Sequence, residues 1–459
     1  MEKENKTNDK QGSFLKGAAI IAAGGFIAKL LGALYRIPLT NLIGGHGMGL
    51  YQMVYPVYCL LLTVSATGIP SSIAKLTAEK IGGGNSAAPV FKTAMKLFLL
   101  IGFFGSVLMA AIAPFLSRAQ GSEEVMSGYF ALAPSVLLVS AISVFRGYFQ
   151  GKNDMLPTAL SEICEQIVKI AFGLLFAYLY RDNTAKAVVF LLLAVSISEL
   201  FALILMFLLH KRAAKPEKSE KEGGRVEMKQ ILRLSLPVTF SSILLPLSAL
   251  FDSVFAVRLM SGYSADAVAL YGLFSGGAVT IINLPVSVCY GIAAASVPSV
   301  AQAKAQLEKG KKTAKKPSVR KRIFFALGIT ALISIPAAFG LYFFAEPAAK
   351  LIFRSLQGEE LSLLVQLIKA FAVSAFTLSC VQTLSACLTA QGKPKYAALS
   401  MLIAIVVKTL TYAFLLKNPK ISVLGLAYAT NLCYLVAFLL DLLYNLWVSK
   451  PPKRARTKE

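Results

Sequence analysis

Residues 162–169 place four polar side chains in a stretch of sequence that is otherwise apolar. Their spacing of i, i+3, i+4 and i+7 puts them on one face of a helix: Glu162, Glu165, Gln166 and Lys169. Glu165 precedes Lys169 by four residues, which is the favourable order for an ion pair. The two charges of such a pair either neutralise each other and stabilise the helix, or the pair rearranges as a switch between two states. Glu162 lies nearer the start of the helix and can be hydrated.

Single charged side chains occur within other apolar stretches. A charge at the centre of a bilayer costs about 2.5–3.5 kcal/mol on insertion scales, so each one is a candidate for function. Lys29 and Lys408 have no carboxylate in their own stretches. We expect them to face a polar cavity, an acid from another helix or a bound anion. Arg36 and Arg258 either line that cavity or extend to the outer surface, and Asp252 is the best counter-charge in the second half.

The surrounding sequence predicts an all-α integral membrane protein. Of the 459 residues 56% are hydrophobic and 15% are charged, whereas soluble domains have about 25% charged residues. Apolar stretches of roughly 20 residues, the length that a membrane helix needs, follow one another and predict about twelve spans. Their continuous apolar character disfavours a transmembrane barrel. We place the spans at residues 13–39, 48–73, 90–115, 126–148, 157–179, 186–209, 231–257, 266–302, 322–345, 361–389, 396–416 and 421–447.

The net charge of +24 reports orientation in the membrane. Of the 47 lysines and arginines, 34 fall in loops and span ends on the side of the N-terminus, nine on the opposite side and four within spans. This is the positive-inside pattern, which predicts that both termini are cytoplasmic. The basic loops are then expected to contact anionic lipid headgroups, and no nucleic-acid partner is expected.

Two internal similarities predict a duplicated architecture. ALS at 159–161 aligns with ALS at 398–400, which pairs Lys169 with Lys408 at the same offset, and a weaker match pairs Arg36 with Arg258. Repeats six spans apart have the same orientation, so we expect two six-helix bundles related by a pseudo-two-fold axis along the membrane normal. The predicted division is an N-terminal bundle at 1–209, a basic cytoplasmic linker at 210–230, a C-terminal bundle at 231–449 and a basic tail at 450–459.

The residue types favour transport over catalysis. The sequence contains no HExxH motif, no phosphate-binding GxxxxGK[ST] loop and no Asp-rich diphosphate motif. Its two histidines, His46 and His210, are too few and too far apart for a histidine-based metal site. We therefore expect no enzyme activity, no metal and no cofactor. The predicted spans hold more cations than anions, which suits an anionic cargo such as a pyrophosphate-linked lipid, and Asp441 near the end of the last span is expected to be hydrated.

Three longer segments resemble a known family. RGYFQGKNDMLPTALSEICEQIVK at 146–169 is similar to the hallmark segment of the stage V sporulation protein B family of polysaccharide-type transporters. KGAAIIAAGGFIAKLLGALYRIPLTNLIGGHGMGLYQMVYPVY at 16–58 and GIPSSIAKLTAE at 68–79 resemble the first two spans of that family. The family belongs to the multidrug, oligosaccharidyl-lipid and polysaccharide exporter superfamily.

The resemblance implies a flippase for undecaprenyl-linked glycans, with lipid II as the leading candidate, in the bacterial cytoplasmic membrane. It implies that peptidoglycan or spore-cortex synthesis uses the cargo, and that the pyrophosphate and sugars enter a cationic cavity between two bundles. By this resemblance Lys29 and Arg36 match basic positions of MurJ-type lipid II flippases, and Glu165, Gln166 and Lys169 match the EQxxR/K pattern of the sporulation family.

Two other functions stay open from the sequence. A cation-coupled drug exporter of the same superfamily would need an acidic ion-binding cluster and a cavity suited to cations. A membrane scaffold that recruits cell-wall synthesis enzymes would depend on the basic loops, so that deletion of residues 212–226 would abolish its function. For a transporter, protons, sodium ions and the membrane potential are all candidate energy sources.

Overall fold

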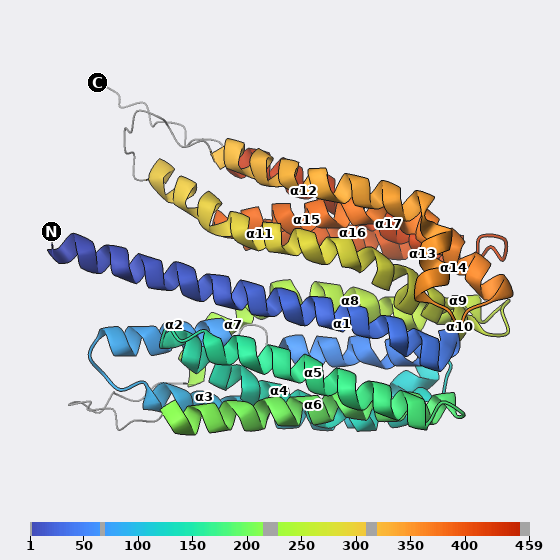
Figure 1. The fold of residues 1–459 in the computed structure, drawn as a ribbon, viewed down its shortest axis with the longest axis horizontal. Coiled ribbons are helices and arrows are strands. Elements are labelled where there is room, and N and C mark those ends of the chain that lie inside the picture. The colour runs from blue at the N-terminus through green and yellow to red at the C-terminus, as the bar shows by residue number, and fades with distance from the viewer. Residues whose placement is uncertain (1, 65–68, 214–227, 309–318, 450–459) are drawn as a thin grey trace. The chain divides into compact units, whose positions relative to one another are not determined.

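The computed structural model describes residues 2–64, 69–213, 228–308 and 319–449, and in these ranges the protein is helical without any strand (Figure 1). The all-α prediction is therefore confirmed for the described part of the chain. Two of the elements, η2 and η3, are π-helical turns. In chain order the elements are α1 (Glu2–Leu62), α2 (Ile69–Gly82), α3 (Ala88–Ala119), α4 (Val125–Gly151), α5 (Leu156–Leu179), α6 (Thr184–Ala213), α7 (Met228–Ser242), α8 (Leu244–Phe251), η2 (Asp252–Ala256), α9 (Val257–Met260), α10 (Ala267–Gly272), η3 (Leu273–Ala278), α11 (Val279–Glu308), α12 (Val319–Phe343), α13 (Ala345–Ile352), α14 (Gly358–Phe371), α15 (Val373–Ala390), α16 (Pro394–Leu415) and α17 (Leu424–Val448).

Nine segments within the described residues are long and apolar enough to cross a membrane. They are Ala23–Leu62, Ala88–Ala119, Val125–Gly151, Thr184–Ala213, Ala267–Ala293, Val319–Phe343, Val373–Ala390, Pro394–Leu415 and Leu424–Val448. This number does not confirm the predicted twelve. The difference arises at three places, the first two predicted spans, the fifth and the seventh.

The first two predicted spans both lie in α1. Its 61 residues form two helices that are joined at a kink at Gly44. At 1.5 Å per residue an unbroken helix of this many residues would be about 90 Å long, far more than the bilayer core of about 30 Å. Gly44 has φ of 69° and ψ of −175°, a conformation that glycine adopts without the steric cost of a side chain. The break divides α1 into two helices that meet at Gly44.

Charged residues explain why the fifth predicted span is not counted, and a proline explains why the seventh is not. The fifth predicted span is the single helix α5, but Glu162, Glu165 and Lys169 make it too polar to count by composition. The seventh predicted span is broken at Ile243, between α7 and α8. Pro246 clashes with the carbonyl group four residues before it, which belongs to Ser242, the last residue of α7.

Close packing of the chain divides the protein into two compact units. The first contains Met1–Thr280 and Lys350–Ser362, and the second contains Ile281–Ala349 and Leu363–Glu459. The predicted linker at 210–230 falls largely on residues 214–227, outside the described residues, as does the basic tail at 450–459. The predicted division into two related six-helix bundles stays a prediction.

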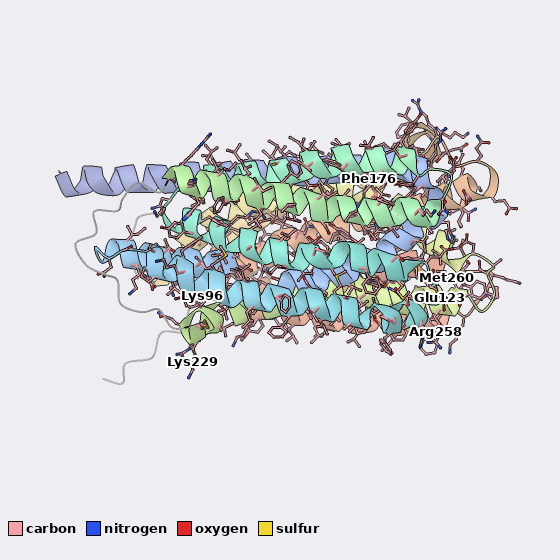
Figure 2. The ribbon with its side chains drawn as sticks, turned by 90° about the horizontal axis from the view of Figure 1, so that it is seen from below. Lys96, Glu123, Phe176, Lys229, Arg258 and Met260 are labelled. Carbon is pink, nitrogen blue, oxygen red and sulfur yellow. The ribbon has the colours of Figure 1, made fainter. Side chains whose placement is uncertain are left out.

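The core of the first unit is formed by apolar side chains between α2, α3, α4 and α6. One cluster contains Ile73, Phe98 and Tyr148, and a second contains Ile142 and Phe149. The exposed surfaces of the same helices are also apolar, as expected for helices that face lipid. In Figure 2, Lys96 and Lys229 lie at one end of these helices, and Arg258 lies at the other end beside Glu123 and Met260. This agrees with the predicted alternation, which puts Lys96 and Lys229 on the side opposite Arg258.

The second unit is held together partly by polar contacts between the parallel helices α15 and α17. Ser374 Oγ donates to Asn431 Oδ1 at 2.5 Å and Ser385 Oγ donates to Asp441 Oδ2 at 2.5 Å. Hydrogen bonds of this kind join helices inside membranes. Asp441 is only 1% exposed, so the expectation that it is hydrated is wrong. The serine on the neighbouring helix provides the partner that allows its burial.

Candidate functional site

A cluster of charged side chains lies inside the first unit, on α1, α4, α5 and α6. We refer to it as the charge cluster, and its members are Arg36, Arg146, Glu165, Lys169 and Glu199. Lys169 is 8% exposed and Glu199 is 2% exposed, so both are removed from the surface of the protein. A buried charge is costly unless it is paired or hydrogen-bonded, so the partners of each member decide what the charge cluster can do.

Arg146 on α4 is the ion-pair partner of Glu165 on α5. The distance from Arg146 Nη2 to Glu165 Oε2 is 3.3 Å, and Arg146 Nε donates to Ser161 Oγ at 2.9 Å. Gln166 Nε2 donates to the other oxygen of Glu165 at 3.2 Å. The predicted ion pair between Glu165 and Lys169 is therefore not the one that forms. The hairpin of α4 and α5 offers Glu165 a guanidinium group held by a second hydrogen bond, which fixes it better than a flexible ammonium group.

Lys169 instead lies between several charged groups. It interacts electrostatically with the carboxylates of Glu165 and Glu199 and with the guanidinium group of Arg36. Two acids on different helices thus offset its charge, although no ion pair within 4.0 Å joins Lys169 to Glu165 among the described residues. This position leaves the ammonium group available to exchange one partner for another.

Glu199 on α6 is the most buried member of the charge cluster. Tyr58 on α1 donates its hydroxyl hydrogen to Glu199 Oε1 at 3.1 Å. The other oxygen, Oε2, is buried without a hydrogen-bond partner among the described residues. A buried carboxylate with one unsatisfied oxygen is costly, so this group is a candidate for binding a proton or a cation.

The face of α1 that packs against α5 contains both glycines and cationic residues. Gly25, Lys29, Gly32 and Arg36 are spaced i, i+4, i+7 and i+11 and therefore share one face of the helix. A Cβ atom at Gly32 would lie 3.1 Å from Gln166 Oε1, and one at Gly25 would lie 3.6 Å from Glu162 Oε2. The missing side chains thus leave room for the polar face of α5. The side chain of Lys29 lies outside the described residues.

Aromatic rings extend the charge cluster along the second segment of α1. The rings of Tyr51 and Tyr55 stack with their centroids 5.2 Å apart, and those of Tyr55 and Tyr58 are 5.6 Å apart. Arg36 interacts electrostatically with Tyr51 and Tyr55. A row of phenol rings beside cations and acids can present hydroxyl groups to a sugar or phosphate.

The remaining predicted site residues are not members of the charge cluster. Asp252 is 9% exposed within the π-helical turn η2 of the first unit, and Arg258 is exposed on α9. Lys408 is 5% exposed on α16 in the second unit. Their roles in a cavity stay predictions. Within the described residues, no three potential ligands among His, Cys, Asp and Glu come together as a metal site.

Sequence reasoning missed two members of the charge cluster. The sequence places Arg146 at the end of a predicted span, where a charged residue is expected. It places Glu199 within a span as one polar group among several, without a partner that the sequence could name. The available signal for Arg146 was its place in the same RGYFQG segment that leads into α5. Glu199 gave a weaker signal, a lone acid in the stretch LLLAVSISELFALIL.

Comparison with known proteins identifies the family. A family model described as "Polysaccharide biosynthesis protein" matches residues 14–304, which include the whole charge cluster. The chain belongs to the polysaccharide biosynthesis protein family. A second model, MatE, matches residues 237–414 of this family member.

Curated relatives of this polysaccharide biosynthesis family member come from Bacillus subtilis (strain 168). Stage V sporulation protein B is 26% identical over 429 residues, which cover 91% of this chain and 80% of the relative. Lipid II flippase MurJ is 21% identical over 450 residues, 93% of this chain and 81% of the relative. The resemblance to the stage V sporulation protein B family is thus confirmed.

Solved structures share the fold of this member of the polysaccharide biosynthesis family. An inward-facing multidrug resistance MATE family transporter of the MOP superfamily has a TM-score of 0.74 at 17% identity and covers 93% of this chain and 96% of its own. Lipid II flippase MurJ in an inward closed conformation has a TM-score of 0.69 at 15% identity and covers 94% and 90%. The protein therefore has the MATE and MurJ fold of a multi-pass membrane protein.

Proposed function

We propose that this protein is a flippase that moves an undecaprenyl-pyrophosphate-linked glycan, lipid II or a related cell-wall precursor, across the bacterial cytoplasmic membrane by alternating access. The proposal includes twelve spans with both termini in the cytoplasm. The names of two relatives support it, because one is a lipid II flippase and the other a sporulation protein. Partners of the protein are then the lipid-linked substrate and the surrounding membrane lipids.

The observation that carries the proposal is the balance of charge in the charge cluster. Arg36, Arg146 and Lys169 provide three cations, and Glu165 and Glu199 provide two carboxylates. With all five groups ionised, one positive charge is left over in a region where an unpaired charge is costly. A diphosphate group offsets this charge and accepts hydrogen bonds from guanidinium and ammonium groups.

The contacts suggest how cargo binding changes the charge cluster. Arg146 is held by Ser161 and Glu165, so its guanidinium group acts as a fixed part of the site. Lys169 and Arg36 have weaker ties and are the groups that turn towards a diphosphate. When the cargo leaves, Glu165 and Glu199 again offset the charge of Lys169. Cargo release is thereby coupled to the contacts between helices of the N-terminal bundle.

Reconstituted vesicles test this function. Labelled lipid II in the inner leaflet becomes accessible to a membrane-impermeant reagent only after it is flipped. We expect Lys169→Gln and Arg36→Gln each to reduce the flipping rate about tenfold or more, because a hydrogen bond to a charged group contributes about 1.5–3 kcal/mol. Lys75→Gln is the matched control, since Lys75 is exposed and forms an ion pair with Glu79 of its own helix. Unchanged rates for both cluster variants at equal protein levels would contradict the assignment.

A cation-coupled multidrug exporter is the second candidate. The MatE match over residues 237–414 favours it, as does the unsatisfied oxygen of Glu199, which could bind a proton or cation. The same vesicles loaded with cationic dyes separate the two functions, because an exporter of this kind moves the dye and leaves lipid II in place. Imposing a proton gradient, a sodium gradient or a membrane potential in turn identifies the energy source.

A further inference from the structure

The second unit has an open pocket formed by the start of α16 and the end of α17. It has a volume of about 510 Å³ and is lined by Tyr396 of α16 and by Leu443, Tyr444, Leu446 and Trp447 of α17. This volume lies in the range of about 300–1,000 Å³ that is typical of ligand pockets. Its walls are apolar and aromatic, so the part of a ligand that enters it is apolar.

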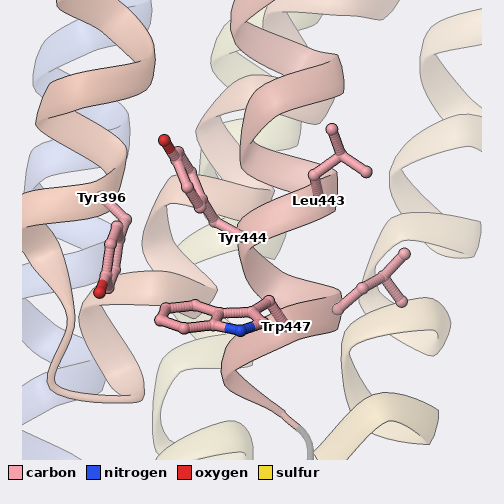
Figure 3. A pocket seen from close by; sticks show the side chains of 5 residues that line it. Tyr396, Leu443, Tyr444 and Trp447 are labelled. Atoms are coloured by element: carbon pink, nitrogen blue, oxygen red, sulfur yellow. The ribbon is translucent and has the colours of Figure 1, made fainter.

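The aromatic rings form a corner. The ring centroids of Tyr396 and Tyr444 are 4.9 Å apart, and the ring of Trp447 meets that of Tyr396 edge-on at 5.5 Å and 86°. Figure 3 shows the two tyrosine rings side by side with the indole ring across one end. Trp447 remains 57% exposed and Leu443 61% exposed. The pocket is therefore open on the side where these residues meet the surrounding membrane.

Cationic residues adjoin residues that line the pocket. Lys393 and Lys395 flank the first turn of α16 and are exposed, and Tyr396 follows directly. Arg320 of α12 donates from Nη2 to the carbonyl oxygen of Leu446 at 3.0 Å and from Nε to Ser449 Oγ at 3.2 Å. The guanidinium group is thus fixed beside a residue that lines the pocket.

The start of α16 adds to this positive potential. Pro394 begins the helix, and Lys393 at the N-cap makes no side-chain capping hydrogen bond. A helix N-terminus carries a partial positive charge. The adjoining sequences 391–396 (QGKPKY), 442–449 (LLYNLWVS) and 319–322 (VRKR) contain no acidic residue. Asp441, which precedes the second of them, is buried and accepts a hydrogen bond from Ser385. The charges at this edge suit an anion, and the pocket beside them suits an apolar chain.

We propose that this pocket binds an anionic phospholipid of the membrane leaflet that meets this end of α17. The glycerol region and the first acyl segments lie against Tyr396, Tyr444 and Trp447, and the phosphate faces Lys393, Lys395 and Arg320. A belt of interfacial tyrosine and tryptophan residues occurs in many membrane proteins and does not select between headgroups. The combination of an aromatic corner with cations on its edge does select, and with the proposed topology this leaflet is the cytoplasmic one.

Trp447 provides a direct probe of the pocket, because it is the only tryptophan in the chain. The full-length protein is reconstituted in vesicles of phosphatidylcholine to which acyl-brominated phosphatidylglycerol or acyl-brominated phosphatidylcholine is added at equal fractions. Bromine quenches tryptophan fluorescence on contact. We expect stronger quenching by the brominated phosphatidylglycerol, and a smaller difference at high salt because salt screens the attraction.

Two variants with matched controls decide whether the pocket is the cause. Lys393→Gln with Lys395→Gln should reduce the preference for phosphatidylglycerol by about fivefold for each lysine removed. The control is Lys417→Gln with Lys420→Gln. These lysines are also exposed but follow the opposite end of α16, so this variant should retain the preference for phosphatidylglycerol.

The second pair of variants separates a site from a diffuse attraction to the basic surface. Tyr396→Ala removes one wall of the pocket and should abolish the preference while both lysines remain. Phe414→Ala removes another exposed aromatic ring of α16 and should leave the preference intact. Equal quenching of the unaltered protein by the two brominated lipids would overturn the proposal, and so would a preference that survives Tyr396→Ala. Circular dichroism and size-exclusion profiles confirm that each variant is folded before it is compared.

Discussion

Arg146 and Glu165 join α4 to α5, with 3.3 Å between Arg146 Nη2 and Glu165 Oε2 and side chains that are only 14% and 18% exposed. The pair lies in the helical hairpin that the resemblance to the stage V sporulation protein B family singled out. Both residues of the pair belong to the same segment of 24 residues. The hairpin of α4 and α5 therefore holds Glu165 through a contact of its own.

Breaking this pair should destabilise the protein. Arg146→Met leaves the carboxylate of Glu165 largely buried, with Gln166 as its one hydrogen-bond partner among the described residues, and removing one partner of a buried pair costs about 3–5 kcal/mol. Because both side chains retain some exposure, we expect about 2–4 kcal/mol, measured as a lower unfolding temperature in detergent. The double variant Arg146→Met with Glu165→Met should regain most of the loss. Arg181→Gln, in an exposed pair with Asp182, should change nothing, and an equal loss there would contradict the prediction.

The sequence predicts the helical membrane fold well because that fold depends on composition and length. Continuous apolar runs determine where most helices lie, and the spacing of Glu162, Gln166 and Lys169 correctly places them on one face of α5. The breaks are harder to predict. Pro246 interrupts the predicted span after Ser242, whereas Pro114 and Pro134 lie inside helices that stay continuous, and prolines are often tolerated in membrane helices.

The partners within the charge cluster depend on tertiary structure and therefore escaped prediction. The order of Glu165 and Lys169 favours their pairing on an isolated helix by about 0.2–0.5 kcal/mol. The folded hairpin offers Glu165 a guanidinium group instead, and that contact outweighs the local preference. The contact of Tyr58 with Glu199 joins residues 141 positions apart, which no local pattern in the sequence reveals.

The hydrogen bond from Tyr58 to Glu199 should contribute measurably to stability. Tyr58→Phe leaves both oxygens of a 2% exposed carboxylate without the partner that the described residues provide. We expect a loss of about 1–3 kcal/mol, the cost of an unsatisfied buried polar group. Tyr178→Phe removes a hydroxyl group from an exposed ring and serves as the control. If Glu199→Met restores the unfolding temperature of Tyr58→Phe, the unsatisfied carboxylate is the cause; no recovery would point to packing.

Two glycines of α1 should respond differently to a methyl group. At Gly24 a Cβ atom would lie 2.6 Å from the Cβ and 3.0 Å from the Cα of Ala159 on α5. These atoms cannot move without separating the helices, so Gly24→Ala should cost about 1–3 kcal/mol. At Gly32 the nearest atom is Oε1 of Gln166, at 3.1 Å, and this flexible side chain can turn away.

Gly32→Ala should therefore be neutral or stabilising, because alanine favours a helix over glycine by about 1 kcal/mol. Thermal unfolding of the two variants under the same conditions measures the difference. An equal loss at both positions would contradict the prediction and would mean that Gln166 cannot turn away from Gly32.

His46 connects three elements at the end of the first unit where Glu123 lies. Its Nδ1 is 3.0 Å from Asp266 Oδ2 and its Nε2 is 3.3 Å from Glu124 Oε2. Asp266 is the N-cap of α10, where it also accepts from the backbone N–H of Ala269 at 2.8 Å, and Glu124 is the N-cap of α4. His46 lies two residues after the break at Gly44, between the predicted spans 13–39 and 48–73.

The stability of this junction should depend on pH. Burial lowers the pKa of His46, but the hydrogen bonds and negative charges of Asp266 and Glu124 outweigh it and raise the pKa above its ordinary value of 6.5. The folded protein thus holds the proton more tightly than the unfolded chain, so the stabilisation is complete below pH 6.5 and is lost as pH rises through the raised pKa. The unfolding temperature of His46→Gln should therefore fall below that of the unaltered protein at about pH 5.5 and approach it at about pH 8.5. Glu124→Gln should weaken this pH dependence while Glu123→Gln, one residue away, preserves it. A difference that stays constant with pH would show that His46 acts through its shape alone.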